Sequence, residues 1–362
     1  MTSKERMMLA LRREVPDRVP ATVHQWQAYH LDKYLDGLDP ISAFRRFDLD
    51  AAIICFPIDE PQTPNWQRRV VETRNADGNI VQHITVTTPE GTLSETIEVS
   101  PFTQWFTGHP IKRPEDVDLI DKYMPVPRLD REALAREYDR LGDDGILRGF
   151  VWGVQGGCWQ HAAAWYGLEP LIMATFDNPD WVHHFLRVLQ KKKMQFIAES
   201  LPGAKYDLIE TGGGASSSTC ISPEIHREFC LPYDREQHDA LHALGFPCAY
   251  HTCGGMMAIL DLVVENGCDA SETLTPAGMG GDARHAEIKQ RIGSEVCLIG
   301  GMNQFQVLDR GTPEQIREEV HRLFADLGTH GGYMMSPSDH FFETPPQNLQ
   351  WYADAAKACR YS

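Results

Sequence analysis

The chain has no long apolar run and few positive charges, and both deficits limit what it can do. No stretch approaches the roughly 20 uninterrupted apolar residues of a membrane span, so we expect no membrane-spanning helix. Lysine and arginine number 34 against 51 aspartate and glutamate residues, which gives a formal net charge of −17. This balance argues against nucleic acid or an anionic membrane surface as the main partner.

The chain also lacks the cysteine pattern of a protein held together by disulfides. Its nine cysteines are odd in number and irregular in spacing, and several lie in apolar runs. This pattern indicates reduced thiols. The first residues, Met1-Thr-Ser-Lys-Glu-Arg6, are charged and contain no signal-peptide apolar region. We therefore expect a cytoplasmic protein.

Motifs of several common enzyme classes are missing. The run Gly212-Gly-Gly-Ala215 has neither the G-x-G-x-x-G spacing nor the partner acid of a dinucleotide-binding site. We find no nucleophile elbow, kinase or P-loop signature, and no Ser/His/Asp set that residue order supports. The sequence gives no support to a dinucleotide-binding, kinase or serine-hydrolase function.

What the chain does contain is a regular alternation of strand-like and helix-like segments. Helix starts are marked by caps such as the capping box Thr312-Pro-Glu-Gln315. Buried strands joined through helices pair in parallel. With the N-terminal segments the count reaches about eight units, which predicts an α/β fold, a (β/α)8 TIM barrel. The buried strands are expected near residues 51–56, 145–152, 206–210, 246–251, 270–274, 296–300 and 331–335.

One section departs from this alternation. Residues 68–99 are rich in Thr and Val, alternate polar with apolar positions, and contain the turn signals Asp77-Gly78 and Glu90-Gly91. These features predict antiparallel hairpins, and hence a β-hairpin insertion near the N-terminus. No long linker or low-complexity tract interrupts the chain. We expect one barrel domain over residues 1–362 that carries this insertion.

The pair His251-x-Cys253 is the strongest candidate for chemistry. Active sites of such barrels lie at the carboxyl ends of the strands, and this pair ends the strand expected over 246–251. Positions i and i+2 of an extended segment point to the same side, so an imidazole and a thiolate can reach one zinc ion. A third ligand must come from another strand end, where Asp339 and His340 are the obvious suppliers and Glu210 is another. A buried histidine and cysteine without a metal are the alternative.

Other polar and aromatic residues at strand ends are candidates for catalysis or substrate binding. Glu210 and Glu272 lie in buried strands, where an unpaired carboxylate is costly, so each has either a structural partner or a role in the site. We expect His24 and His161 at the surface or rim. The expected substrate-binding residues are Trp152, Gln155, Tyr250, Glu272 and Asn303.

Motifs along most of the chain resemble the uroporphyrinogen decarboxylase superfamily. The family has a (β/α)8 barrel, so the resemblance implies the same fold. The matching stretches are Lys4-Glu-Arg6, Pro16-Asp-Arg-Val-Pro20, Gly167-Leu-Glu-Pro170, Asp177-Asn-Pro-Asp180, Ser222-Pro-Glu-Ile-His-Arg-Glu-Phe-Cys-Leu-Pro-Tyr233, Gly300-Gly-Met302, Gly311-Thr-Pro-Glu314 and Thr344-Pro-Pro-Gln-Asn348.

Two branches of this superfamily imply different activities. True uroporphyrinogen decarboxylases carry an N-terminal P-x-W-x-M-R-Q-A-G-R-Y segment, whose arginines bind the carboxylates of the tetrapyrrole. The corresponding segment, Val19-Pro-Ala-Thr-Val-His-Gln-Trp-Gln-Ala-Tyr29, contains no arginine. A polycarboxylate needs such cationic partners, so the sequence argues against that substrate.

The second branch consists of zinc-dependent methyltransferases that work with a corrinoid protein. It carries H-x-C at the same strand end, so the resemblance implies that His251 and Cys253 are zinc ligands. Members of this branch also carry a further cysteine in a later loop. The matching loop of this chain, Ser336-Pro-Ser-Asp-His340, contains no cysteine. Asp339 or His340 can replace it, and a harder ligand set leaves zinc more Lewis acidic.

The sequence therefore predicts a zinc-dependent methyltransferase. A methyl group would move between a corrinoid (cobalamin) on a separate protein and a thiol or methoxylated small molecule. The expected catalytic residues are Glu210, Asp339 and His340, and the expected metal ligands are His251, Cys253 and Asp339. The alternative is a metal-free decarboxylase or lyase acting on a smaller substrate, with Asp339 or His340 as proton donor. A homodimer is compatible with either function.

Overall fold

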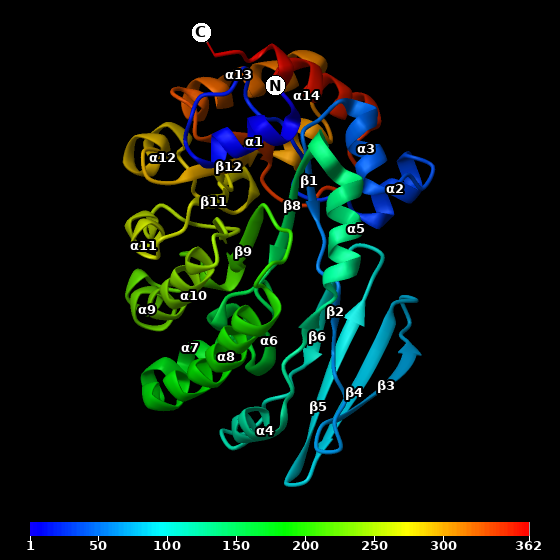
Figure 1. Ribbon diagram of the computed structural model, residues 1–362, viewed down its shortest axis with the longest axis vertical. Helices are drawn as coiled ribbons and strands as arrows, with labels where there is room; N and C mark the ends of the chain where they lie inside the picture. Colours follow the sequence, from blue (N-terminus) through cyan, green and yellow to red (C-terminus); the bar gives the residue numbers. More distant parts are fainter. Residues whose placement is uncertain (362) are drawn as a thin grey trace.

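Seven parallel strands form the central sheet of the computed structural model, which describes residues 1–361 (Figure 1). The strands pair in parallel with aligned registers, so their carboxyl ends lie at one end of the sheet; His251, for example, lies opposite Glu272. In spatial order they are β1 (Ala51–Ile54), β8 (Gly145–Phe150), β9 (Leu208–Gly212), β10 (Cys248–His251), β11 (Ala270–Thr273), β12 (Cys297–Met302) and β13 (Tyr333–Pro337).

Helices surround the sheet, as the alternation predicted. Helix α1 (Ser3–Leu11) lies across the amino ends of the strands, where its Met7 and Leu11 pack with strand residues such as Ile146. Helix α1 does not cover the carboxyl ends of the strands, where the candidate site was predicted. No helix within residues 1–361 has both the length and the apolar character of a membrane span. The other helices are α2 (Ala28–Tyr34), α3 (Pro40–Phe47), α4 (Asp116–Tyr123), α5 (Arg131–Leu141), α6 (Cys158–Tyr166), α7 (Leu168–Asp177), α8 (Pro179–Ser200), α9 (Pro223–Phe229), α10 (Leu231–Ala243), α11 (Leu260–Glu265), α12 (His285–Ile292), α13 (Pro313–Leu323) and α14 (Pro346–Ala358).

Pro232 lies where two helices meet. A proline inside a helical stretch can bend a single helix, but here the chain forms two, α9 and α10, with Cys230 between them and Pro232 in the first turn of α10. Proline has no backbone N–H to donate and its ring clashes with the carbonyl four residues before it. A helix start satisfies both constraints, because the first N–H groups have no partner there.

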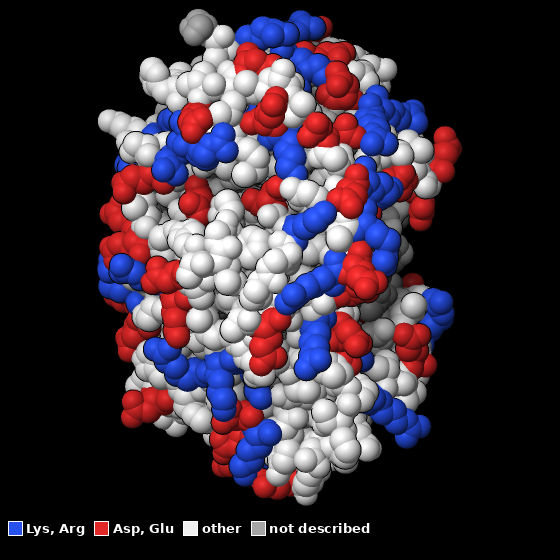
Figure 2. Space-filling model, in the orientation of Figure 1, with Lys and Arg blue, Asp and Glu red and all other residues white. Residues whose placement is uncertain are grey.

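Charged side chains cover the surface in a mixed pattern. On the face drawn in Figure 2, lysine and arginine alternate with aspartate and glutamate around an uncharged central area. This face carries no continuous basic stripe of the kind that tracks a nucleic-acid backbone. The nine cysteines are all free, so the prediction of no disulfide framework is confirmed.

The predicted hairpin insertion is a four-stranded antiparallel sheet. It comprises β3 (Gln67–Arg74), β4 (Ile80–Thr88), β5 (Gly91–Val99) and β6 (Gln104–Gly108), and so extends past the expected residue 99. Gly78 has φ +83°, as the predicted Asp77-Gly78 turn requires. A small antiparallel pair is formed by β2 (Ile58–Asp59) and β7 (Arg128–Leu129). That barrel and insertion form a single domain stays a prediction.

An extended segment over residues 19–23 closes the sheet into a barrel. The Met335 N–H donates to Pro20 O at 2.9 Å and the Thr22 N–H donates to Met335 O at 2.9 Å, so the segment pairs in parallel with β13. On its other side, the Asp50 N–H donates to Ala21 O at 2.8 Å, just before β1. The segment fills the eighth strand position, and the predicted (β/α)8 barrel is confirmed.

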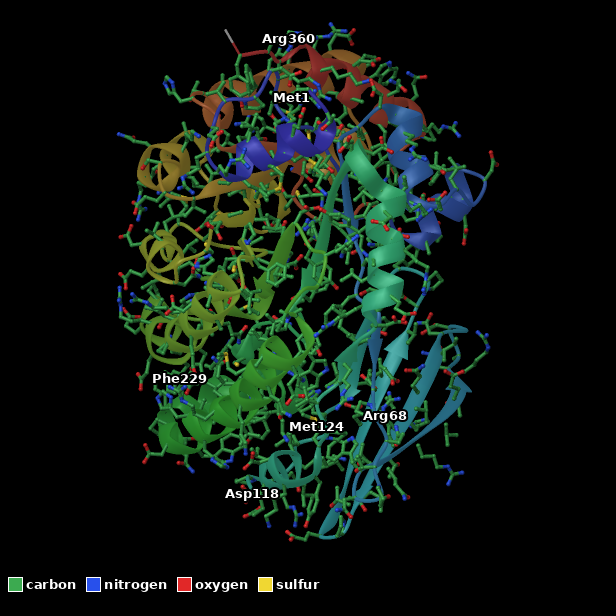
Figure 3. The ribbon with its side chains drawn as sticks, viewed as in Figure 1. Met1, Arg68, Asp118, Met124, Phe229 and Arg360 are labelled. Carbon is green, nitrogen blue, oxygen red and sulfur yellow. The ribbon has the colours of Figure 1, made fainter. Side chains whose placement is uncertain are left out.

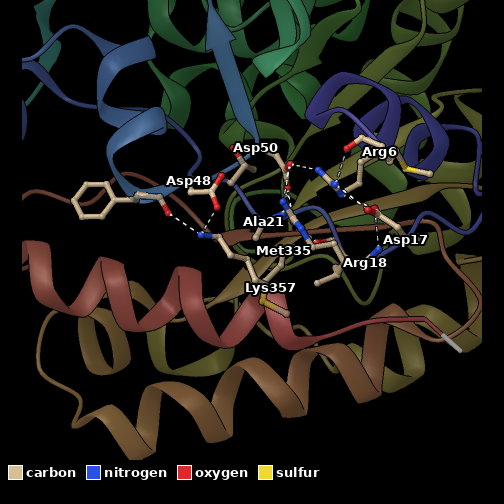
Figure 4. Close-up of polar contacts among 12 residues, drawn as sticks. Arg6, Asp17, Arg18, Ala21, Asp48, Asp50, Met335 and Lys357 are labelled. Atoms are coloured by element: carbon tan, nitrogen blue, oxygen red, sulfur yellow. Dashed lines mark hydrogen bonds and ion pairs between the residues drawn. The ribbon is translucent and has the colours of Figure 1, made fainter.

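Asp50 anchors this closure from the base of the barrel (Figure 4). Its fully buried carboxylate accepts hydrogen bonds from Arg6 at 2.7 Å, from Arg18 at 2.7 Å and from the Ala21 N–H at 2.9 Å. Two arginines compensate a charge that would otherwise be costly to bury. Arg6 and Arg18 of the N-terminal motifs, through Asp50, therefore hold the closing segment in place. The segment in turn positions His24, which follows it.

Candidate functional site

A buried ion cluster lies inside the barrel, on three strands. Arg148 of β8 donates from Nη2 to Glu210 Oε2 of β9 at 2.8 Å and to both carboxylate oxygens of Glu272 of β11 at 2.8 Å. All three side chains are at most 3 % exposed. Two buried carboxylates are tolerated because the guanidinium compensates them. Both glutamates were predicted as candidates, whereas Arg148 was missed. The signal that could have revealed Arg148 is a charged residue inside a buried strand.

The two carboxylates titrate differently. Burial raises the pKa of Glu210 to about 7, and the neighbouring charge of Glu272 adds to the effect. Burial opposes ionisation of Glu272 as well, but Arg148 and His251 outweigh it and hold the pKa of Glu272 well below its ordinary value. One carboxylate therefore stays ionised, while the other can take or give a proton near neutral pH.

His251 ends β10 and is oriented by these carboxylates. Its Nδ1 lies 3.0 Å from Glu272 Oε1 and 3.5 Å from Glu210 Oε1, and its ring is 2 % exposed. An ionised carboxylate only accepts hydrogen bonds, so Nδ1 carries the hydrogen. Burial opposes a charged imidazole, but hydrogen bonds with Cys253 and Glu272 prevail and raise the pKa of His251 well above its ordinary value.

The Cys253 thiol lies beside His251, as the i, i+2 spacing predicted. The side chain is half-buried, in the loop after β10. Gly214, in the loop after β9, packs directly against it, because a Cβ built on Gly214 would lie 2.5 Å from the Cys253 sulfur. Glycine at this position keeps space for the sulfur.

His24 is the site residue that sequence reasoning placed wrongly. It was expected at the surface or rim, but it is 6 % exposed, because the closing segment before it is part of the barrel wall. Its ring centroid lies 5.5 Å from that of His251 and 5.0 Å from that of His340, and its Nδ1 is 4.0 Å from Glu272. Burial lowers the pKa of His24 to about 3, so the imidazole is neutral at physiological pH.

Asp339 and His340 reach the same place from the loop after β13. Both are partly exposed, unlike the buried histidines. The Gln27 side-chain amide donates to His340 Nδ1 at 2.8 Å and fixes its ring. Burial alone would raise the pKa of Asp339, but the charges of the surrounding histidines outweigh burial and hold that pKa below its ordinary value.

Two overlapping groups of side chains in the described chain could hold a metal ion at the mouth. His24, His251 and Glu272 form one, and His24, Asp339 and His340 form the other, with the ligand atoms of each group within 4.8 Å of one another. His24 belongs to both. Cys253, predicted as a ligand, belongs to neither group, and Asp339 shares a group with His24 and His340 but not with His251. The ligand set His251, Cys253 and Asp339 therefore stays a prediction.

The remaining predicted substrate-binding residues are placed differently. Trp152 and Gln155 lie in the loop after β8, and Gln155 Oε1 accepts from the Gly214 N–H at 3.4 Å. Tyr250 points away from the cluster, because neighbouring strand residues face opposite sides; its hydroxyl donates to Asp234 at 2.9 Å.

Asn303 also stays outside the cluster. Its Oδ1 accepts from the Gln306 N–H at 2.9 Å and so caps a short helical segment after β12. His161, like His24, was expected at the surface or rim, but it is only 1 % exposed. Substrate contacts of any of these residues stay predictions.

Curated relatives of the chain have two activities. A stretch of 191 residues is 28 % identical to a uroporphyrinogen decarboxylase of Methylobacillus flagellatus and covers 51 % of this chain and 50 % of that protein. A stretch of 261 residues is 25 % identical to a methylated-thiol–coenzyme M methyltransferase of Methanosarcina mazei, covering 69 % of this chain and 64 % of the relative. The matches thus span from half to just under two thirds of these relatives' lengths.

The fold and the family agree with these relatives. A solved methyltransferase structure from Methanosarcina mazei superposes with a TM-score of 0.67 over 99 % of both chains, at 15 % identity, which shows a shared fold. The sequence profile described as uroporphyrinogen decarboxylase (URO-D) matches residues 97–359, most of the chain. The resemblance inferred from the motifs is confirmed, and the chain belongs to the uroporphyrinogen decarboxylase (URO-D) family.

Proposed function

We propose that the protein is a zinc-dependent methyltransferase that moves a methyl group between a corrinoid on a partner protein and a thiol or methoxylated small molecule. The observation that carries the proposal is the convergence of His24, His251 and Glu272 within 4.8 Å, next to the Cys253 thiol, at the barrel mouth. The methyltransferase among the relatives supports methyl transfer as the reaction. A cytoplasmic location is part of the proposal.

The donor chemistry of this cluster fits zinc. Imidazole nitrogen, thiolate sulfur and carboxylate oxygen are the ligand types that zinc takes. His251 and Cys253 would hold the ion together with Asp339, and His24 offers a neutral imidazole as a further ligand. When bound, zinc lowers the pKa of a thiol substrate or polarises an ether oxygen.

The surrounding residues prepare the site for this role. Because Glu272 accepts the Nδ1 hydrogen of His251, the Nε2 nitrogen of that ring is left to face a ligand. Glu210, with a pKa of about 7, is the group able to accept the proton that a thiol releases. Arg148, which is itself buried in the barrel interior, holds both carboxylates in place through its hydrogen bonds.

A metal-free decarboxylase or lyase is the second candidate, and Glu210 favours it. A buried carboxyl with a pKa near 7 can also deliver a proton to a carbanion. A polycarboxylate substrate fits poorly, however, because Arg148 already pairs with Glu210 and Glu272. Any substrate of this second kind would carry few carboxylates.

Metal content of the purified protein is the deciding measurement. We expect about one zinc per chain in mass spectrometry after excess zinc is removed, and its loss in His251→Ala and Cys253→Ala. The matched control is His184→Ala, an exposed histidine of α8 that pairs with Asp118 and belongs to none of the candidate metal groups, so this variant should keep the zinc. The zinc-loaded protein should also demethylate methylcobalamin in the presence of a thiol. Wild-type protein that takes up no zinc would refute the proposal in favour of the metal-free alternative.

A further inference from the structure

A cavity of about 330 Å³ lies between the antiparallel sheet and the barrel, apart from the metal cluster. Aromatic rings form much of its wall: Phe56, Trp152 and Trp165 on the barrel side, Trp66 before β3, and Phe106 on β6. Figure 3 labels two further lining residues, Arg68 and Met124. A dry apolar cavity of about 150 Å³ already holds benzene, so this one has room for one substituted ring or two fused rings.

A buried histidine without a partner faces this cavity. His161 lines it, is 1 % exposed, and its Nδ1 has no hydrogen-bond partner among the described residues. Its ring packs edge-on against Trp165 and Trp152, with centroids 4.1 and 5.2 Å away. Packing of this kind fixes the ring, and it leaves the buried Nδ1 without a partner.

Lys193 determines which nitrogen of His161 carries the hydrogen. The fully buried Lys193 ammonium donates to Trp152 O at 2.6 Å. A Cβ on Gly153 would lie 2.4 Å from Lys193 Nζ and 2.5 Å from His161 Nδ1, so both groups border the same small space. An ammonium group repels an N–H dipole and attracts a lone pair. The favoured tautomer therefore has its lone pair on Nδ1 and its hydrogen on Nε2.

The charges around the cavity favour a neutral ligand. Glu60, Arg68 and Glu95 line it, and no ion pair is formed by them within residues 1–361. Burial raises the pKa of Glu95, which Arg68 opposes and Glu60 reinforces. One positive and two negative groups leave a net charge of −1 or closer to zero, which disfavours an anionic ligand.

We propose that this cavity binds a neutral aromatic molecule of one or two rings whose hydroxyl or methoxyl oxygen accepts a hydrogen bond from His161. The loop after β8 connects it to the metal cluster: Trp152 lines the cavity, while Gln155 contacts Gly214, which packs against Cys253. Binding itself does not depend on zinc.

The test is isothermal titration calorimetry of the metal-free protein with 2-methoxyphenol, and with toluene as a ring without oxygen. Ile97→Trp places a large side chain in the cavity, while Val71→Trp places one on β3 at a residue 45 % exposed and is the matched control. His161→Phe keeps the ring packing and removes the donor.

We expect saturable binding of 2-methoxyphenol that Ile97→Trp weakens at least tenfold and Val71→Trp leaves unchanged. His161→Phe should weaken 2-methoxyphenol about tenfold and leave toluene unaffected, since one hydrogen bond is lost. Absence of saturable binding, or equal affinity in the two tryptophan variants, would overturn the inference. Binding by a protein that takes up no zinc would refute the proposed function alone.

Discussion

Removal of Arg148 is the sharpest perturbation of the buried cluster. The change Arg148→Met keeps much of the side-chain volume but leaves Glu210 and Glu272 without the guanidinium that lies 2.8 Å from each. Breaking a buried ion pair by deleting one partner costs about 3–5 kcal/mol. Total stabilities of about 5–15 kcal/mol leave room for a folded variant. We therefore expect a free energy of unfolding lower by about 3–5 kcal/mol at pH 8.

The pH dependence of this loss gives the reasoning a second, independent check. Without Arg148 the folded-state pKa values of both carboxyls lie above their unfolded values, so the penalty is present at high pH and falls away as pH drops towards about 4. Urea unfolding of the metal-free protein, followed by tryptophan fluorescence, should show a much smaller loss at pH 5 than at pH 8. The double variant Arg148→Met/Glu210→Gln should recover part of the stability, because one carboxylate has been neutralised.

Two results would refute this account of the cluster. A loss below about 1 kcal/mol at pH 8 would mean that the guanidinium does not compensate the carboxylates, since even an ordinary hydrogen bond contributes that much. An equal loss at pH 5 and pH 8 would assign the effect to packing of the methionine instead of to charge.

Three further predictions concern the Cys253 thiol, the His251 imidazole and the buried carboxyl of Asp234, which lies outside the cluster. Gly214→Ala should weaken zinc binding at least tenfold in a competition titration, because its Cβ would lie 2.5 Å from the Cys253 sulfur. Zinc affinity should fall as pH falls, measured in the same titration, because the raised pKa of His251 makes protons compete for its ring. Asp234, which accepts from Tyr250, has a pKa raised by burial to about 7, so its ionisation destabilises the fold increasingly between about pH 4 and 7. Asp234→Asn should therefore be more stable than wild type in urea unfolding at pH 8, by up to about 4 kcal/mol, with little difference at pH 4.

The barrel could be predicted because local signals repeat along the chain. Buried runs and capped helices alternate, and parallel pairing follows from burial on both faces. The limits of local signals appear at β6 (Gln104–Gly108), which joins the insertion sheet although it alternates poorly and is largely exposed. At Pro232 a local signal marks a disturbance of the helix, but it does not say whether the proline bends one helix or, as here, separates α9 from α10.

The candidate site could be predicted only in part, because some of its contacts follow from local spacing and others from long-range pairing. The spacing of His251 and Cys253 and the period of two within a strand are local, so their convergence could be predicted. The same period, applied to Tyr250, would have turned that side chain away from the cluster. The role of His24 depends on a pairing between Ala21 and Met335, residues more than 300 positions apart, and no local pattern reveals that contact.

The charges at the barrel mouth separate the two activities found among the relatives. Glu210, Glu272 and Asp339 gather there, and Arg148 is held by two of them. A polycarboxylate entering this site would meet these carboxylates and no unpaired guanidinium within the cluster. A divalent cation would meet the carboxylates, the neutral imidazole of His24 and, once its proton is displaced, His251. On a barrel that the family shares, these side chains favour a cation over an anionic substrate at the mouth.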